Sequence, residues 1–73
     1  MNAYQKIANA LKIATEMPAD GTVAELDGIL VCHLPGTSMK VEQVRVRFNS
    51  RTYRRRLVRG SWAKTEEIEA DIC

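Results

Sequence analysis

Residues 44–59 read VRVRFNSRTYRRRLVR, a run in which apolar and charged side chains alternate. A period of two indicates half-buried β-strands, because successive strand residues point to opposite faces of a sheet. The alternation is interrupted around Asn49-Ser50, where turn-forming residues gather. We therefore expect an antiparallel hairpin whose two strands are joined by a four-residue loop over 49–52.

This register places four arginines on one face of the hairpin. It sets Arg47 opposite Arg54 and Arg45 opposite Arg56, while the other face receives apolar side chains. Like charges directly across a sheet are unfavourable by up to ~1 kcal/mol per pair. The arginine side of the hairpin therefore needs a counter-charge, and the nature of that counter-charge is the functional question.

Charge is distributed unevenly along the chain. All seven arginines lie between Arg45 and Arg59, a window with no acidic residue and a charge of +7. Residues 1–44 carry −2 and residues 60–73 carry −3, so the net charge of the chain is only +2. A strongly basic hairpin thus lies between two mildly acidic flanks.

The segment before the hairpins has a helical pattern. Apolar residues fall on one arc of the first 17 residues, with Ile7 at its centre, and polar residues lie opposite. Asn2 is a suitable N-cap, and Pro18 ends the helix because it has no N–H to donate. We interpret the apolar arc as a surface packed against the core.

A second hairpin is expected over residues 22–34. Asp27-Gly28 separates two apolar runs, and this dipeptide suits a type I′ turn, which requires positive φ at both positions. The two-residue turn pairs Leu26 with Ile29 and Ala24 with Val31. Both faces of this hairpin are apolar, so we expect the helix to cover one face and a curled sheet or a second subunit to cover the other. This favours a homodimer.

Together these patterns predict an α+β fold in one small domain, residues 1–73. The N-terminal helix should pack on a curved antiparallel sheet of four to five strands, built from two hairpins and a C-terminal strand. Residues 67–72 alternate with period two and are expected to form that strand, although Ile68 and Ile72 also have helical spacing. The expected core is Ile7, Leu11, Ala14, Leu26, Ile29, Val31, Val44, Val46, Phe48 and Leu57.

Several classes of protein are disfavoured by the remaining residues. No apolar run is long enough for a transmembrane helix, and the N-terminus lacks the apolar region of a signal peptide. The two cysteines, Cys32 and Cys73, are expected to be free thiols in a reducing cytoplasm, because small secreted domains usually carry more disulfides. His33 adjoins Cys32, but neighbouring strand residues face opposite ways. We therefore expect no metal and no cofactor.

The basic hairpin is compatible with three functions and with a neutral alternative. In that alternative, Glu67, Glu69 and Asp71 form an acidic row beside the hairpin and neutralise it. The first functional hypothesis is a non-enzymatic regulatory protein that binds the phosphate backbone of DNA or RNA, because the arginine fork donates paired hydrogen bonds to phosphate. The expected contact residues, in either this or the next hypothesis, are Arg45, Arg47, Arg51, Arg54, Arg56, Arg59 and Trp62.

The second hypothesis is an inhibitor or modulator that docks its basic face on an acidic protein surface, since arginine and tryptophan dominate interface hot spots. Small modulators of this kind are common in phages and other mobile elements. The third is a toxin-like ribonuclease, in which arginines hold the phosphate and His33 or Tyr53 acts as acid or base. His33 has no evident carboxylate partner in the sequence, so we expect no enzymatic activity.

Overall fold

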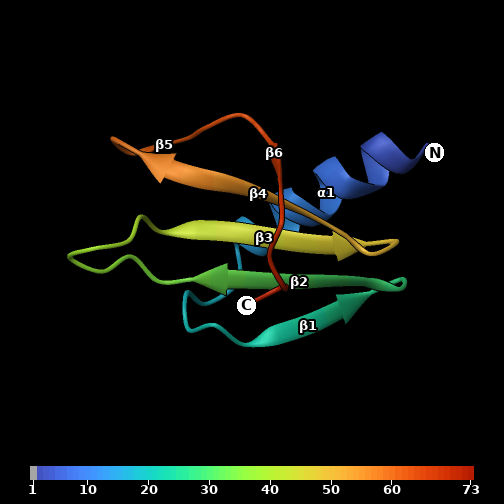
Figure 1. Cartoon of the computed structure of the whole chain (residues 1–73), viewed down its shortest axis with the longest axis horizontal. Coiled ribbons are helices and arrows are strands. Elements are labelled where there is room, and N and C mark those ends of the chain that lie inside the picture. Colours follow the sequence, from blue (N-terminus) through green and yellow to red (C-terminus); the bar gives the residue numbers. More distant parts are fainter. Residues whose placement is uncertain (1) are drawn as a thin grey trace.

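In the computed structural model, which describes residues 2–73, one helix packs on an open antiparallel sheet of six short strands (Figure 1). The strands follow one another in the order β1-β2-β3-β4-β5, and β6 also pairs with β4. The predicted α+β fold is confirmed. The elements are α1 (Ala3–Thr15), β1 (Val23–Leu26), β2 (Ile29–Leu34), β3 (Gln43–Phe48), β4 (Arg51–Val58), β5 (Ser61–Trp62) and β6 (Glu66–Ile68).

Helix α1 begins and ends for local reasons. The Asn2 side chain accepts a hydrogen bond of 2.9 Å from the Gln5 N–H, which satisfies one of the free donors of the first turn. The helix ends at Thr15, three residues before Pro18 and slightly earlier than expected. Its buried side is formed by Ile7, Ala10, Leu11 and Ala14. The predicted cap and packing face are therefore correct.

The β1–β2 hairpin has the predicted register. Leu26 pairs with Ile29 and Ala24 pairs with Val31. Asp27 and Gly28 have φ values of 51° and 79°, as a type I′ turn requires. Glycine at the second turn position makes this geometry accessible without steric cost.

The β3–β4 hairpin is tighter than the sequence suggested. Phe48 pairs with Arg51, so Asn49 and Ser50 alone form the turn, with φ values of 52° and 64°. The expected four-residue loop was wrong, and the register is shifted by two residues. A shift of two leaves every side chain on its predicted face, because strand side chains alternate with a period of two.

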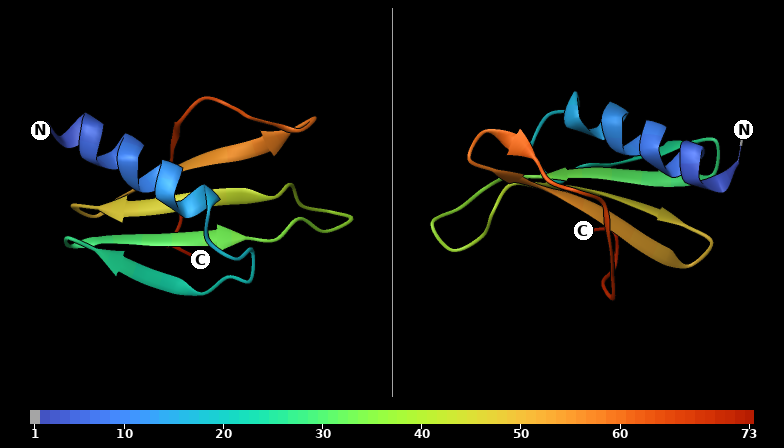
Figure 2. Two further views of the ribbon diagram at one scale, coloured as in Figure 1. Left: turned by 180° about the vertical axis from the view of Figure 1, so that it is seen from behind. Right: turned by 90° about the horizontal axis from the view of Figure 1, so that it is seen from above.

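The chain after β4 runs back along the free edge of that strand. β5 pairs with its carboxyl-terminal end and β6 with its amino-terminal half, through Arg54–Glu66 to Thr52–Ile68. The expected strand over 67–72 is only partly correct, because β6 stops at Ile68. Residues 69–73, which we call the C-terminal segment, leave the edge and cross the sheet on the side opposite α1 (Figure 2). Hydrogen bonds from side chains on that side replace the expected strand pairing.

The core lies between α1 and the facing side of the sheet. Seven of the ten predicted core residues are buried in it, and Leu26 and Phe48 pack against it while partly exposed. Leu57, near the end of β4, is half-buried. Ala10 and Cys32 are buried in addition.

The two cysteines form a disulfide, Cys32–Cys73, so the expectation of free thiols was wrong. Cys32 lies in β2 and is fully buried on the side opposite α1, where the C-terminal segment brings Cys73 to it. This segment therefore covers part of the second apolar face of the β1–β2 hairpin. Val23 on the same face remains 43% exposed. The homodimer expected from that face stays a prediction.

Candidate functional site

Four arginines share the side of the sheet opposite α1. Arg45 and Arg47 come from β3, and Arg54 and Arg56 come from β4; we call this set the arginine face. Arg45 lies directly opposite Arg54, whereas the sequence predicted Arg45 opposite Arg56. Thr52 stands opposite Arg47 and Gln43 opposite Arg56, so neither of the two expected arginine pairs forms, and the hairpin has one direct cross-strand arginine pair in their place. The predicted clustering of the four side chains is present with this altered pairing.

The closeness of these cations affects the pKa of Arg45. Removal from water and, second, the positive charge of Arg54 hold the pKa of the Arg45 guanidinium below its ordinary value. Arginine nevertheless remains protonated across the physiological range. The arginine face therefore holds several positive charges close together, and neighbouring acceptor groups must offset their repulsion.

One carboxylate supplies the direct counter-charge, and it is Glu66. Its Oε2 accepts from Arg54 Nε at 2.9 Å, and its Oε1 accepts from Arg56 Nη2 at 2.6 Å. These hydrogen bonds, from Arg54 first and Arg56 second, lower the pKa of the Glu66 carboxyl. Within residues 2–73, the buried Arg56 Nε–H finds no acceptor. Two arginines thus share one carboxylate.

The other two arginines of the face bind backbone oxygens of the C-terminal segment. Arg47 Nη1 donates to the Ala70 carbonyl at 3.1 Å, and Thr52 Oγ1 donates to the same oxygen at 2.6 Å. Arg45 Nη1 donates to the Asp71 carbonyl at 3.2 Å. These contacts hold the C-terminal segment against the face without using its carboxylates.

The acidic row expected to neutralise the hairpin is not arranged as predicted. Glu67, Glu69 and Asp71 lie along the same stretch of chain, but none forms an ion pair with another part of residues 2–73. Glu66 takes that role because its position opposite Arg54 places its side chain on the arginine face. The sequence-based prediction missed Glu66 because the period-two pattern was taken to begin at Glu67.

Arg51 and Arg59 are exposed at the two ends of β4. Arg51 begins the strand beside the Asn49–Ser50 turn, and Arg59 lies in the turn to β5 with a φ of 51°. Neither guanidinium makes a hydrogen bond or ion pair within the described part of the chain. Arg55, by contrast, points to the α1 side and donates to the carbonyls of Ala63 and Trp62. It is therefore a structural cation rather than a freely solvated one.

Trp62, the predicted aromatic contact residue, lies away from the arginine face. It packs against the core on the α1 side and makes an edge-on contact with the His33 ring, with centroids 5.7 Å apart. Tyr53 and Phe48 also pack against this core. The structure therefore brings four of the seven predicted site residues together, places Arg51 and Arg59 at the ends, and separates Trp62 from them.

His33 has the carboxylate partner that the sequence did not reveal. Its Nε2 lies 2.7 Å from Glu42 Oε1, and its Nδ1 lies 2.9 Å from the Met17 carbonyl oxygen. Because a carbonyl oxygen only accepts, Nδ1–H is the donor to Met17. His33 is 5% exposed, and its ring joins the segment after α1 to the loop between β2 and β3. It lies on the opposite side of the sheet from the arginine face.

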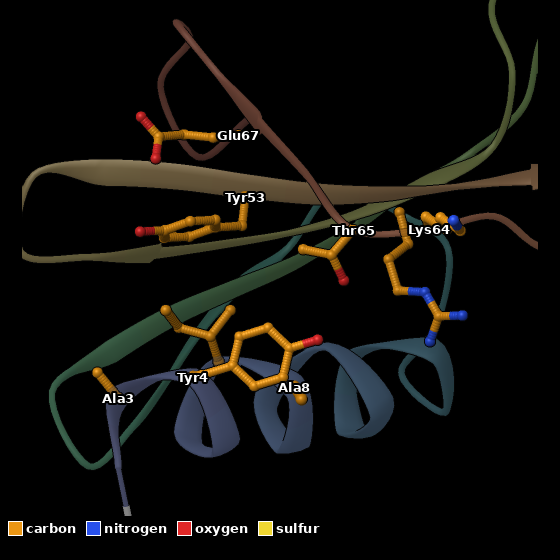
Figure 3. Close-up of a pocket in the computed structure, with 9 residues that line it drawn as sticks. Ala3, Tyr4, Ala8, Tyr53, Lys64, Thr65 and Glu67 are labelled. Carbon is orange, nitrogen blue, oxygen red and sulfur yellow. The ribbon is translucent and has the colours of Figure 1, made fainter.

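A groove of about 830 Å³ separates the first turns of α1 from β4 and the chain that follows β5. Figure 3 shows the rings of Tyr4 and Tyr53 facing this space from the helix and from the sheet. Arg55, Lys64 and Glu67 also line it. A smaller hollow of about 380 Å³ lies between the C-terminal segment and Arg47 and Arg51.

Comparisons with family models, with curated proteins and with solved structures find no match for this chain. Across residues 2–73, no group of three or more His, Cys, Asp or Glu side chains is placed to hold a metal ion. The same part of the chain contains no helix of the length and apolarity needed to cross a bilayer. The arginine face is therefore the feature of the molecule that bears most directly on function.

Proposed function

We propose that this protein is a small cytoplasmic, non-enzymatic regulatory protein that binds the phosphate backbone of nucleic acid. The binding surface consists of the arginine face together with Arg51 and Arg59. The observation that carries the proposal is the direct pairing of Arg45 with Arg54 on a face where one carboxylate, Glu66, serves two guanidinium groups. An anionic ligand would relieve the repulsion that this pairing creates.

The charge balance supports an anionic partner. Residues 45–59 carry seven arginines and residues 66–71 carry four carboxylates, an excess of three positive charges. Phosphate suits such a surface because the arginine guanidinium presents a planar set of donors that matches two phosphate oxygens. The exposed Arg51 and Arg59 add two further positive charges at the two ends of β4.

Nucleic acid is favoured over a protein partner by where the aromatic side chains lie. Phe48, Tyr53 and Trp62 pack on the α1 side, and Tyr4 belongs to α1 itself, so no tryptophan, tyrosine or phenylalanine of residues 2–73 lies on the arginine face. Protein hot spots usually combine arginine with aromatic anchors, and single-strand binders stack bases on them. A face of arginines alone suits contact with a phosphate backbone, which carries no sequence information.

The test is binding to a duplex DNA and to a single-stranded RNA, measured by fluorescence anisotropy at 50 and 200 mM salt. A protein that neutralises six phosphates loses about 10³-fold in affinity over this range. The double variant Arg51→Gln/Arg59→Gln should reduce the slope of log K against log salt by up to about 1.8, because each lost phosphate contact contributes about 0.9. Neither side chain has a partner within residues 2–73, so the fold should be unaffected.

The matched control is Lys6→Gln/Lys12→Gln, which removes two positive charges from exposed positions on α1, on the other side of the sheet. We expect this control to retain the wild-type slope. Absence of binding to either nucleic acid at 50 mM salt, in both the oxidised and the reduced protein, would overturn the proposal. Recovery of one stoichiometric acidic protein that is lost with the arginine variant would instead favour the inhibitor hypothesis.

A further inference from the structure

The C-terminal segment is fixed across the arginine face by one covalent bond. Cys73 is joined to Cys32 of β2, and the intervening residues place Ala70 and Asp71 over Arg47 and Arg45. The rest of the attachment consists of side-chain hydrogen bonds to two backbone carbonyls of the segment. The disulfide is therefore the one covalent contact that holds this segment on the face.

We propose that the Cys32–Cys73 disulfide is a redox latch that closes the arginine face when oxidised and opens it when reduced. This inference rests on the proposed function, since it assigns a regulation to the same surface. In the closed form the C-terminal segment occupies donors of Arg45 and Arg47 and keeps Glu69 and Asp71 near the cations. In the open form those donors and the charge they carry are available to phosphate.

The geometry defines how a thiol reductant opens the latch. Cys73 is exposed whereas Cys32 is fully buried, so an incoming thiolate attacks the sulfur of Cys73. The S–S bond breaks, Cys32 departs as a thiolate and takes a proton from solvent, and a mixed disulfide remains on Cys73. A second thiol of the reductant then attacks the reductant's sulfur in that mixed disulfide. Cys73 is released as a thiolate and takes a proton from solvent. The reductant has given two electrons and become a disulfide.

Arg45 favours this direction of attack. It is the direct cross-strand neighbour of Cys32 and belongs to the same side of the sheet. A cation beside a departing thiolate stabilises it and speeds thiol–disulfide exchange. The arginine face thus includes both the surface that the C-terminal segment covers and a cation, Arg45, that speeds reduction of the disulfide.

Opening should be local because the segment is separable from the rest of the fold. β6 remains paired to β4 through Thr52–Ile68 and the two pairs beyond it, and the core between α1 and the sheet contains none of residues 69–73. Once the disulfide is broken, residues 69–73 are no longer fixed on the face, and their gain in conformational entropy favours the open form. We expect residues 69–73 to become disordered while α1 and the central strands keep their structure.

Backbone ¹⁵N relaxation of the full chain, with and without dithiothreitol, tests the latch directly. We expect reduction to lower the heteronuclear NOE of residues 69–73 to values typical of a disordered segment and to leave those of α1 and β2 unchanged. Unchanged values in residues 69–73 would overturn the proposal, because the hydrogen bonds alone would then hold the segment. An equal loss of order in α1 would also overturn it, because reduction would then unfold the whole domain.

Binding of a duplex DNA oligonucleotide tests the regulatory consequence. The reduced protein should bind at least tenfold more tightly than the oxidised protein, and the variant Cys73→Ser should bind tightly whether or not dithiothreitol is present. The oxidised variant Thr52→Val, which loses the hydrogen bond to Ala70 but keeps the disulfide, provides a folded control and should stay close to the oxidised wild type. Equal affinity of the reduced and oxidised wild type would refute the regulation.

The two proposals fail in different ways. If neither redox form binds DNA or RNA but reduction still releases residues 69–73 locally, the proposed function fails and the latch as a conformational device stands. If both forms bind nucleic acid equally, the proposed function stands and the latch does not regulate it.

Discussion

Replacing Cys73 with serine should lower the free energy of unfolding by about 4 kcal/mol. The disulfide joins residues 41 positions apart, and closing a loop of that length in the unfolded chain costs about 4 kcal/mol in the chain-entropy description. Domains of this size have total stabilities of roughly 4–11 kcal/mol. The variant should therefore keep roughly 0–7 kcal/mol of stability, a much smaller margin than that of the wild type.

The measurement is urea denaturation followed by far-ultraviolet circular dichroism, for the oxidised wild type, the reduced wild type and the serine variant. The reduced wild type and the variant should unfold at similar urea concentrations, because both lack the cross-link. The melting temperature should fall by roughly 15–30 °C for a loss of this size in a domain of this length. The urea dependence of the free energy should also steepen, because the uncross-linked chain exposes more surface.

A difference below about 1 kcal/mol between the oxidised wild type and the serine variant would refute the reasoning. The same conclusion would follow if the reduced wild type kept the midpoint of the oxidised form. Cys32→Ser is the informative comparison, because it places a hydroxyl at a fully buried position and should be less stable than the Cys73 variant.

Other substitutions test the fold and the arginine face in the same denaturation assay. Leu11→Ala should cost 2–5 kcal/mol, roughly, because the side chain is fully buried; a loss below 1 kcal/mol would contradict the assigned core. Asn2→Ala should cost about 1 kcal/mol through loss of the N-cap, whereas Asn2→Ser should be nearly neutral. Glu66→Gln should be less stable than wild type at neutral pH. Since the folded pKa of Glu66 lies below its unfolded value, that deficit should disappear as the pH falls through the folded pKa; a deficit independent of pH would refute the ion pairs.

The sequence predicted an element correctly where residues close together in the chain determine its structure. The helix followed from its apolar period and Asn2, and the first hairpin followed from Asp27-Gly28, whose required positive φ values are those that the turn adopts. The register of the second hairpin was missed because Ser50 takes a positive φ, which a residue with a Cβ rarely adopts in isolation. Pairing along the whole of β3 and β4 compensates for that local cost.

In the candidate site, too, some features follow from the sequence and others depend on the tertiary structure. The sequence alone determined that Arg45, Arg47, Arg54 and Arg56 share one side, because alternation fixes the face of a strand residue even when the register is wrong by two. Only the tertiary structure decided that Glu66 offsets two of these charges, that Trp62 belongs to the core, and that Cys73 reaches Cys32. Those contacts join residues distant along the chain, and no local period encodes the path of a segment that leaves the sheet after Ile68.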